Sequence, residues 1–397
     1  MTVVTAFSDL ADTVGAIATA YDGVRDRLGG DPDLLVLYHT LHHSADAVAE
    51  ATARLPANVR VHGGTTFRGL LSDAGVHVVG PVIGMMGVGT RGVRCGTAIM
   101  AKGDDPRGAA VAAVHAALAD ADRSGEIPDL VLLCGTVGGE EECLAGIASV
   151  LGARVPVFGA TAGGVACDLA TSRVLVRGAE RAEAIAVAVV FSSHPVSRAF
   201  HAGCVPTHFA DIANGCEGPR VVHRIGGAPA ADVYAKWVHL QTGTPLPEDA
   251  TSLHTALAPL GREVGRIGEF PLYALTHVDE LRADGALVMM TDVAEGDELR
   301  LMVGARTTLV ARPARAVEAA ITLQCADVCA VSGGLIAFCA GLAALVADDL
   351  HEVQSSLRAA MLDRPFLAPF TFGEQGNLTD DRAVHANLMI SSLIFGV

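Results

Sequence analysis

Three segments of the chain share one pattern of apolar and polar positions. In each, a short apolar run of strand type leads through a polar turn and a helical pattern into a second strand, which ends in a small Gly- or Thr-rich turn. The first strands are LLVLY (34–38), LVLLC (130–134) and LIAFC (335–339), and the second strands end in VHGGTTF, VPVFGATAGG and PFTFGEQG. The pattern predicts three repeated strand–helix–strand units.

A further strand-like run follows each unit, at 82–88, 184–191 and 388–395. The region between the second and third units has its own strands and an amphipathic helix that begins near Pro229. We therefore predict an α/β fold with mixed sheets in two domains. Residues 1–195 hold two repeat units, residues 215–397 hold an insert and the third unit, and the join lies within 193–218.

Two glycine-rich turns resemble phosphate cradles. A dinucleotide or P-loop site needs the glycine turn to open a helix, whose first amides hold the anion. The stretch after 155–164 (VPVFGATAGG) is typical of a loop and a β-hairpin, and the stretch after 87–92 (GVGTRG) alternates like a strand. Both patterns favour turns over nucleotide binding, and we expect the first to bring backbone close to a shared pocket.

Composition and charge limit the classes of partner and the cellular compartment that we expect. The 397 residues are 51% hydrophobic and 18% charged, and the net charge is −16. No basic cluster could neutralise a nucleic-acid backbone, so we expect no nucleic-acid partner. The amino terminus shows no secretory pattern, which predicts a cytoplasmic protein with nine reduced cysteines. The apolar run 334–347 is too short to span a membrane, so we expect a buried strand running into a buried helix.

The third unit carries the most reactive combination of side chains. A thiol becomes a nucleophile when a histidine accepts its proton and a carboxylate orients the imidazole. Cys339, His385 and Glu374 could fill these roles, since they lie at a strand end, a later strand start and the turn between them. The alternative is that Cys339 is a core residue, Glu374 a turn residue and His385 a hydrogen-bonding residue at a strand start.

The equivalent turns of the other units supply further pocket candidates. If the units pack as repeats, their turns meet, and the predicted ligand-binding residues are His39, His42, Thr65, Cys134, Thr161 and Thr371. The spacing of His39, His42 and His43 could place two imidazoles on one helix face, but a third ligand is not apparent, so we predict no metal site. We interpret Cys325 and Cys329 as a buried helix face.

Three consecutive glutamates, Glu140 to Glu142, open the helix of the second unit. We interpret them as partners of the positive end of the helix dipole rather than as acid–base groups.

Several runs of the chain together resemble a known family. The runs are GAPAADVYAKWV, FPLYAL, VMMTDVAEGDELRLMVGA, LIAFCAGLAAL, PFTFGEQG and HANLMISSLIF. They resemble the C-terminal part of FIST proteins (F-box and intracellular signal transduction), and PDLVLLCGTVGG with VPVFGATAGG is similar to the N-terminal part. The sequence departs from the family pattern at Leu342, where an arginine is usual after Cys–x–Gly. The loss of that arginine puts in doubt an inherited recognition of an anionic ligand.

The resemblance implies small-molecule sensing with output through a separate signalling partner. Some relatives look like haem-binding nitric-oxide sensors, so a haem gas sensor is one alternative, although no cofactor is predicted and covalent haem attachment is excluded by the lack of Cys-x-x-Cys-His. The other alternative is a hydrolase of a small cyclic amide or similar metabolite that uses Cys339 and His385. The sequence leaves open whether the protein is an enzyme and whether it forms a homo-oligomer.

Cyanuric-acid-type amidohydrolases also consist of three repeated units, each with a Ser–Lys pair. This chain has only two lysines, Lys102 and Lys236, so three such pairs cannot form.

Overall fold

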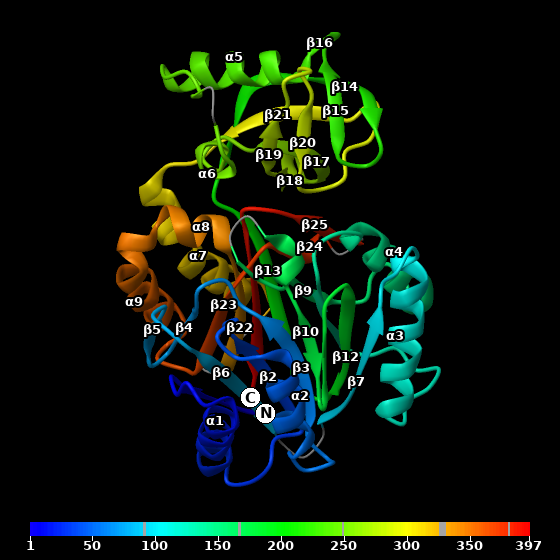
Figure 1. The fold of residues 1–397 in the computed structure, drawn as a ribbon, viewed down its shortest axis with the longest axis vertical. Coiled ribbons are helices and arrows are strands. Elements are labelled where there is room, and N and C mark those ends of the chain that lie inside the picture. Colours follow the sequence, from blue (N-terminus) through cyan, green and yellow to red (C-terminus); the bar gives the residue numbers. More distant parts are fainter. Residues whose placement is uncertain (90–92, 166–167, 248–249, 325–330, 380–381) are drawn as a thin grey trace.

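The chain folds into three similar units, in agreement with the predicted repeat, with a fourth body above them (Figure 1). The computed structural model describes residues 1–89, 93–165, 168–247, 250–324, 331–379 and 382–397. The predicted α/β class with mixed sheets is confirmed, since each repeat pairs two strands in parallel and its other strands antiparallel. Within these described ranges, no helix is both long enough and apolar enough to cross a membrane.

Each unit contains a parallel pair of strands flanked by antiparallel ones. The first unit comprises β1 (Thr2–Ser8), α1 (Thr13–Leu28), β2 (Leu34–His39), α2 (Ala45–Ala53), β3 (Arg60–Thr65) and β6 (Ile83–Gly89). The second comprises β7 (Val93–Ala101), α3 (Pro106–Asp120), β8 (Leu130–Gly135), α4 (Glu140–Leu151), β9 (Val157–Thr161) and β12 (Ala184–Ser192). The third comprises β13 (Val196–Ala202), α7 (Arg306–Gln324), β22 (Val331–Cys339), α8 (Ala340–Leu345), α9 (Leu350–Ala360), β23 (Phe366–Thr371) and β26 (Met389–Gly396).

A hairpin from each unit completes the sheet of a neighbouring unit. The hairpins are β4 (Leu70–Ser72) with β5 (Gly75–His77), β10 (Val174–Val176) with β11 (Ala179–Arg181), and β24 (Gly373–Thr379) with β25 (Arg382–Ala386). Strand β10 pairs with β3, β24 with β9, and β4 with β23, so the exchange closes a ring. The hairpin predicted after Gly164 is therefore present, and β7 rather than a helix follows the GVGTRG run, whose residues 90–92 lie outside the described ranges.

The ends of the three second strands meet at the centre of this ring. Parallel pairing places His39 opposite Thr65, Gly135 opposite Thr161, and Cys339 opposite Thr371. Backbone hydrogen bonds link the turns in a cycle, from Gly163 N to Thr65 O (2.9 Å), Phe67 N to Phe370 O (3.0 Å) and Phe372 N to Thr161 O (2.9 Å). The three small turns seen in the sequence thus occupy equivalent positions, as the repeat predicted.

Burial on both faces explains the unbroken apolar runs of the strands. Along β8, Leu132 and Cys134 point to the core shared by the three sheets, whereas Val131 and Leu133 pack under α3 and α4. Because strand side chains alternate between faces, a strand covered on both sides is apolar at every position. The run 334–347 is likewise a buried strand, β22, that leads into α8, while the predicted helix face of Cys325 and Cys329 lies outside the described residues.

The fourth body is inserted between β13 and α7 of the third unit. It comprises β14 (Val205–Glu217), β15 (Val221–Ile225), β16 (Ala228–Pro229), α5 (Ala230–Thr242), α6 (Ser252–Thr255), β17 (Leu260–Ile267), β18 (Phe270–Thr276), β19 (Val278–Leu281), β20 (Leu287–Met289) and β21 (Glu298–Val303). It has its own apolar core, which includes Tyr234 and Trp237. β13, which lies within the predicted join 193–218, pairs with β26 in the sheet of the third unit.

Candidate functional site

The structure brings Cys339 and Glu374 together but not His385. The Thr371 hydroxyl donates to Glu374 Oε1 at 2.7 Å, and the Met389 amide donates to Glu374 Oε2 at 3.2 Å. Burial, followed by the charge of Glu374, raises the pKa of the Cys339 thiol. Burial also raises the pKa of Glu374 well above its ordinary value. A protonated thiol beside a carboxyl group that favours its neutral form is a poor nucleophile.

Strand register separates His385 from that pair. In the β24–β25 ladder Glu374 lies opposite Ala386, and Gln375 lies opposite His385. Directly opposed residues share a face and successive residues alternate, so Glu374 and His385 point to opposite faces of the ladder. The arrangement in which Glu374 orients His385 beside Cys339 is therefore not formed.

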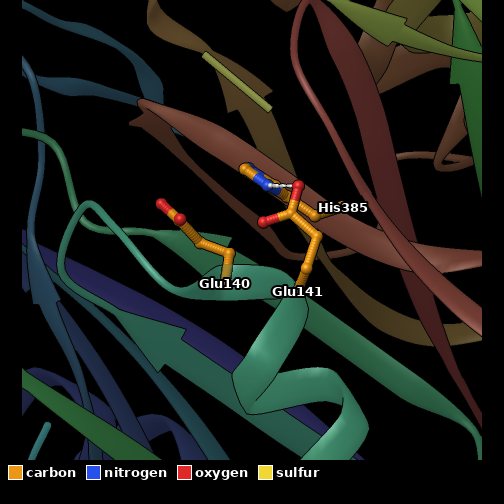
Figure 2. A group of neighbouring side chains, drawn as sticks. All are labelled: Glu140, Glu141 and His385. Atoms are coloured by element: carbon orange, nitrogen blue, oxygen red, sulfur yellow. Dashed lines mark hydrogen bonds and ion pairs between the residues drawn. The ribbon is translucent and has the colours of Figure 1, made fainter. Parts of the chain in front are cut away.

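His385 instead pairs with the first turn of α4 (Figure 2). Its Nδ1 lies 3.1 Å from Oε1 of Glu141, and the imidazole is almost completely buried. Within the described part of the chain, the other ring nitrogen, Nε2, has no hydrogen-bond partner, and it faces the backbone of Gly373, where a Cβ atom would lie 2.6 Å away. Because a carboxylate bound at Nδ1 favours a proton on that atom, the pair holds the imidazole in one orientation.

The inserted body reaches the same helix end through Arg220. The guanidinium donates to Glu140 Oε2 at 2.7 Å, to Glu141 Oε2 at 3.3 Å and to Asp292 Oδ1 at 3.0 Å. The Asp292 amide also donates to Glu141 Oε1 at 2.9 Å. Arg220 and Asp292 thus tie the inserted body to α4, a contact that sequence reasoning missed because the two segments lie far apart in the chain.

The local sequence explains why the carboxylates stand there. Gly139 adopts φ 74°, the left-handed conformation favoured by glycine, and provides the N-cap of α4. The three glutamates then occupy the first turn, where the helix dipole stabilises negative charge. The dipole interpretation describes part of their role, and two of them also make the contacts to His385 and Arg220.

Opposite charges set the ionisation of this cluster. Burial alone would raise the pKa of Glu141, but His385 and then Arg220 lower it well below its ordinary value. Burial alone would lower the pKa of His385, but Glu141 and Glu140 raise it. The geometry therefore favours a charged imidazolium–carboxylate pair.

Lys102, one of the two lysines, binds the loop that leads into the same end of α4. The Lys102 ammonium donates to the carbonyl oxygens of Thr136 (2.7 Å), Val137 (3.0 Å) and Gly138 (2.5 Å). Burial lowers the pKa of this ammonium. Lys102 thus stabilises the loop between β8 and α4. All three of these hydrogen bonds are to backbone carbonyl oxygens, and none is to a side-chain hydroxyl.

Ligand atoms of Glu140, Glu141 and His385 lie within 4.8 Å of one another, which is close enough to surround a cation. However, Arg220 already bridges the two carboxylates, and a metal ion would have to displace it. This donor set therefore fits an ion-pair network better than a metal centre.

The candidates of the first unit form a separate buried pair. His39 Nε2 lies 3.2 Å from Glu180 Oε1 on β11, and both side chains are inaccessible to solvent. His42 is exposed, and its Nδ1 lies 3.2 Å from the Thr40 hydroxyl. His39 is thus the last residue of β2, His42 lies in the turn that follows, and the two imidazoles have different surroundings.

The remaining candidates are buried near the centre of the ring. Thr65 donates to the carbonyls of Gly163 and Arg173, and Thr161 accepts from Gln375 at 2.9 Å. Cys134 contacts the Tyr38 hydroxyl at 3.9 Å, and burial raises the pKa of its thiol to about 12. These side chains make structural bonds, and none of them lines the cavity beside α4.

That cavity has a volume of about 330 Å³ and lies between α4, β17 and β25. Its charged lining residues are Glu141, Arg262, Arg382 and His385. Its remaining lining is apolar and consists of Leu144, Ala145, Ile147, Ala148, Ala153, Val155, Val157, Val264, Ala383 and Val384. Its walls come from the second unit, the exchanged hairpin of the third unit and the inserted body. No single segment of the sequence could therefore predict the cavity.

The FIST N domain family matches residues 33–228, and the FIST C domain family matches residues 230–377. The chain belongs to the FIST family. The boundary between the two matches falls within the inserted body, between β16 and α5. No curated protein matches the chain.

Three solved structures that resemble this FIST protein do so distantly. A cyanuric acid hydrolase from A. caulinodans aligns at 9% identity with TM-score 0.34, covering 98% of this chain and 97% of that one. T. maritima PurL complexed with FGAR aligns at 12% identity with TM-score 0.22, covering 99% and 72% of the two chains. The same protein complexed with ADP aligns at 11% identity with TM-score 0.22, covering 100% and 72%. Similarity at this level identifies neither a shared fold nor a shared activity.

Proposed function

We propose that this FIST protein binds a small molecule in the cavity beside α4 and passes the signal to a separate partner protein. The family assignment supports a role in sensing and signal transduction. The observation that carries the proposal is the cavity itself, which is mostly apolar with a few charged groups on its wall. This composition and a volume of about 330 Å³ are typical of small-molecule sites.

The position of the cavity suggests how binding is transmitted. Arg262 and Val264 of the inserted body form one wall, and α4 forms another. The ion pairs of Arg220 with Glu140 and Glu141 tie the inserted body to α4. If α4 and the inserted body can adopt two relative arrangements, a ligand that contacts both stabilises the arrangement to which it binds more tightly. The shift in population is set by the difference between its affinities for the two arrangements. The inserted body is therefore the part of the molecule that we expect to respond.

The proposal places the protein in the cytoplasm. Six described cysteines are free, Cys95, Cys134, Cys143, Cys204, Cys216 and Cys339, as is usual in a reducing compartment.

Ligand-observed NMR with a fragment library tests the proposal. We expect fragments that bind the natural protein to lose binding in Ala148→Trp, which fills the cavity from α4. The control is Ala314→Trp, which places the same side chain in the separate groove between α7 and α9. Fragments that bind Ala148→Trp and the natural protein equally would place the site elsewhere and contradict the proposal.

The hydrolase alternative has weaker support from the geometry. Its predicted nucleophile, Cys339, lies beside Glu374 on the opposite ladder face from His385. Sensing without catalysis therefore fits the arrangement better.

A further inference from the structure

We propose that the cavity selects an anionic small molecule with an apolar body, such as a monocarboxylate. This inference rests on the proposed function, because it assumes that the cavity is the binding site. On the described part of the cavity wall, the carboxylate already has hydrogen-bond partners, whereas guanidinium donors do not.

Among the described residues of the wall, Glu141 is the carboxylate, and it already accepts three hydrogen bonds. Glu141 Oε1 accepts the Asp292 amide at 2.9 Å and His385 Nδ1 at 3.1 Å, and its Oε2 accepts Arg220 at 3.3 Å. The negative charge of Glu141 is thus balanced by two cationic neighbours. A ligand ammonium would have to share this carboxylate with Arg220 and His385, whose positive charges would repel it.

The donors on the wall, in contrast, are in surplus. Nε of Arg262 is buried and has no hydrogen-bond partner among the described residues, and Nη1 lies 3.6 Å from Oδ2 of Asp297. The Arg382 side chain is exposed and its guanidinium bonds to no described residue. A guanidinium offers five donors and cannot lose its charge in a protein, so these two side chains favour an acceptor that carries negative charge.

Asp297 does not remove this surplus. Its carboxylate is about one third exposed and already accepts the Ala294 amide at 2.9 Å. At 3.6 Å its contact with Arg262 is too long for a good charge-assisted hydrogen bond. The Arg262 side chain is 21% exposed, so a ligand carboxylate could approach the exposed part of its guanidinium without breaking a close ion pair.

The rest of the wall specifies the remainder of the ligand. Ten apolar side chains from α4, the segment after it, β9, β17 and β25 surround the cavity. Such a wall penalises polar groups that find no partner and favours an aliphatic or aromatic body. The expected ligand therefore carries its charge at the arginine side and an uncharged body against α4.

A matched pair of probes tests this selectivity. 4-Phenylbutanoate and 4-phenylbutanamide have the same body and differ in charge, and their affinities can be measured by titration calorimetry. We expect the carboxylate to bind at least about tenfold more tightly. Arg262→Gln and Arg382→Gln should each weaken the carboxylate about tenfold and leave the amide unchanged. Arg315→Gln, in the groove between α7 and α9, is the matched control and should change neither.

Three outcomes separate this inference from the proposed function. Equal binding of both probes, abolished by Ala148→Trp, would overturn the anion selectivity and leave the cavity as the site. Binding that survives Ala148→Trp would overturn the site itself. Absence of binding of the carboxylate at millimolar concentration would overturn the selectivity, and the fragment experiment would then decide the site independently. If Arg262→Gln fails to fold, as judged by circular dichroism, the exposed Arg382 still provides the test.

Discussion

Nδ1 of His385 lies 3.1 Å from Oε1 of Glu141, although 244 positions separate the two residues in the chain. The contact joins the exchanged hairpin of the third unit to the helix end of the second unit. It also lies on the cavity wall and beside the Arg220 contact of the inserted body. Three parts of the molecule therefore depend on one ion pair.

Glu141→Gln should destabilise the protein. The substitution keeps the shape of the side chain but leaves a buried imidazolium without its counter-charge, which is costly. Because the Glu141 side chain is 23% exposed, we expect a loss of about 2 kcal/mol in the free energy of unfolding, measured by urea denaturation. The control is Glu142→Gln in the same helix turn, whose side chain is exposed and should change stability by less than about 0.5 kcal/mol. Equal effects of the two substitutions would contradict the pairing.

The contribution of this pair should depend on pH. The raised pKa of His385 gives stability that is present below about 6.5 and lost as the pH rises through its folded-state pKa. The lowered pKa of Glu141 gives stability that is present above about 4.5 and lost as the pH falls. The difference in unfolding free energy between the natural protein and His385→Gln should therefore be largest between about pH 4.5 and 6.5 and decrease toward pH 9. A difference that stays constant over this range would mean that His385 is neutral.

Gly373→Ala should destabilise the protein by crowding the Nε2 side of the His385 ring. A Cβ atom at Gly373 would lie 2.6 Å from His385 Nε2, which is closer than packed atoms allow. We expect a loss of about 2 kcal/mol, measured by thermal or urea unfolding. Gly30→Ala is the matched control, since a Cβ atom there meets nothing within 4 Å. A stable Gly373→Ala protein with unchanged pH dependence would show that the imidazole can move aside.

The Cys339 thiol should react slowly with iodoacetamide in the folded protein. Burial and the nearby Glu374 raise the pKa of this thiol, and the thiolate is the reactive form. Cys216, which is partly exposed, should be alkylated first, as followed by peptide mass spectrometry over time. Alkylation of Cys339 before Cys216 under native conditions would instead support the catalytic prediction.

Addition of haem to the protein should not produce a sharp Soret band that shifts with nitric oxide. An axial ligand needs an accessible imidazole nitrogen or thiolate. His385 has Nδ1 at Glu141 and Nε2 against Gly373, and Cys339 is buried with a raised pKa. The test is an absorbance spectrum before and after addition of haem and then nitric oxide. A Soret band that shifts with nitric oxide would contradict this expectation and direct attention to exposed histidines such as His42.

The local sequence was sufficient to predict the elements of the three units. Alternating and 3.6-residue apolar patterns identified β8, α4 and β9 of the second unit and their counterparts elsewhere. The domain boundaries were harder to predict, because β13 is separated from the rest of its sheet by the inserted body. A short strand before a long insertion carries no signal of which sheet it joins.

The candidate site could be predicted only in part. His385 and the glutamates of α4 stood out in the sequence, but their partners did not. The predicted link from His385 to Glu374 failed because adjacent positions of a strand face opposite ways, and only the register shows which residue stands opposite which. Arg220 and Arg262 gave no signal at all, since a single arginine in a strand is ordinary.

The sequence by itself determined the repeat, the strand and helix types, the small turns and the family, because these depend on patterns between near neighbours in the chain. Only the tertiary structure decided that hairpins exchange between units and that the inserted body closes over α4. The cavity and its charges arise from that exchange, because they are made where separate segments pack together. Such contacts depend on register and docking, and a linear pattern does not contain them.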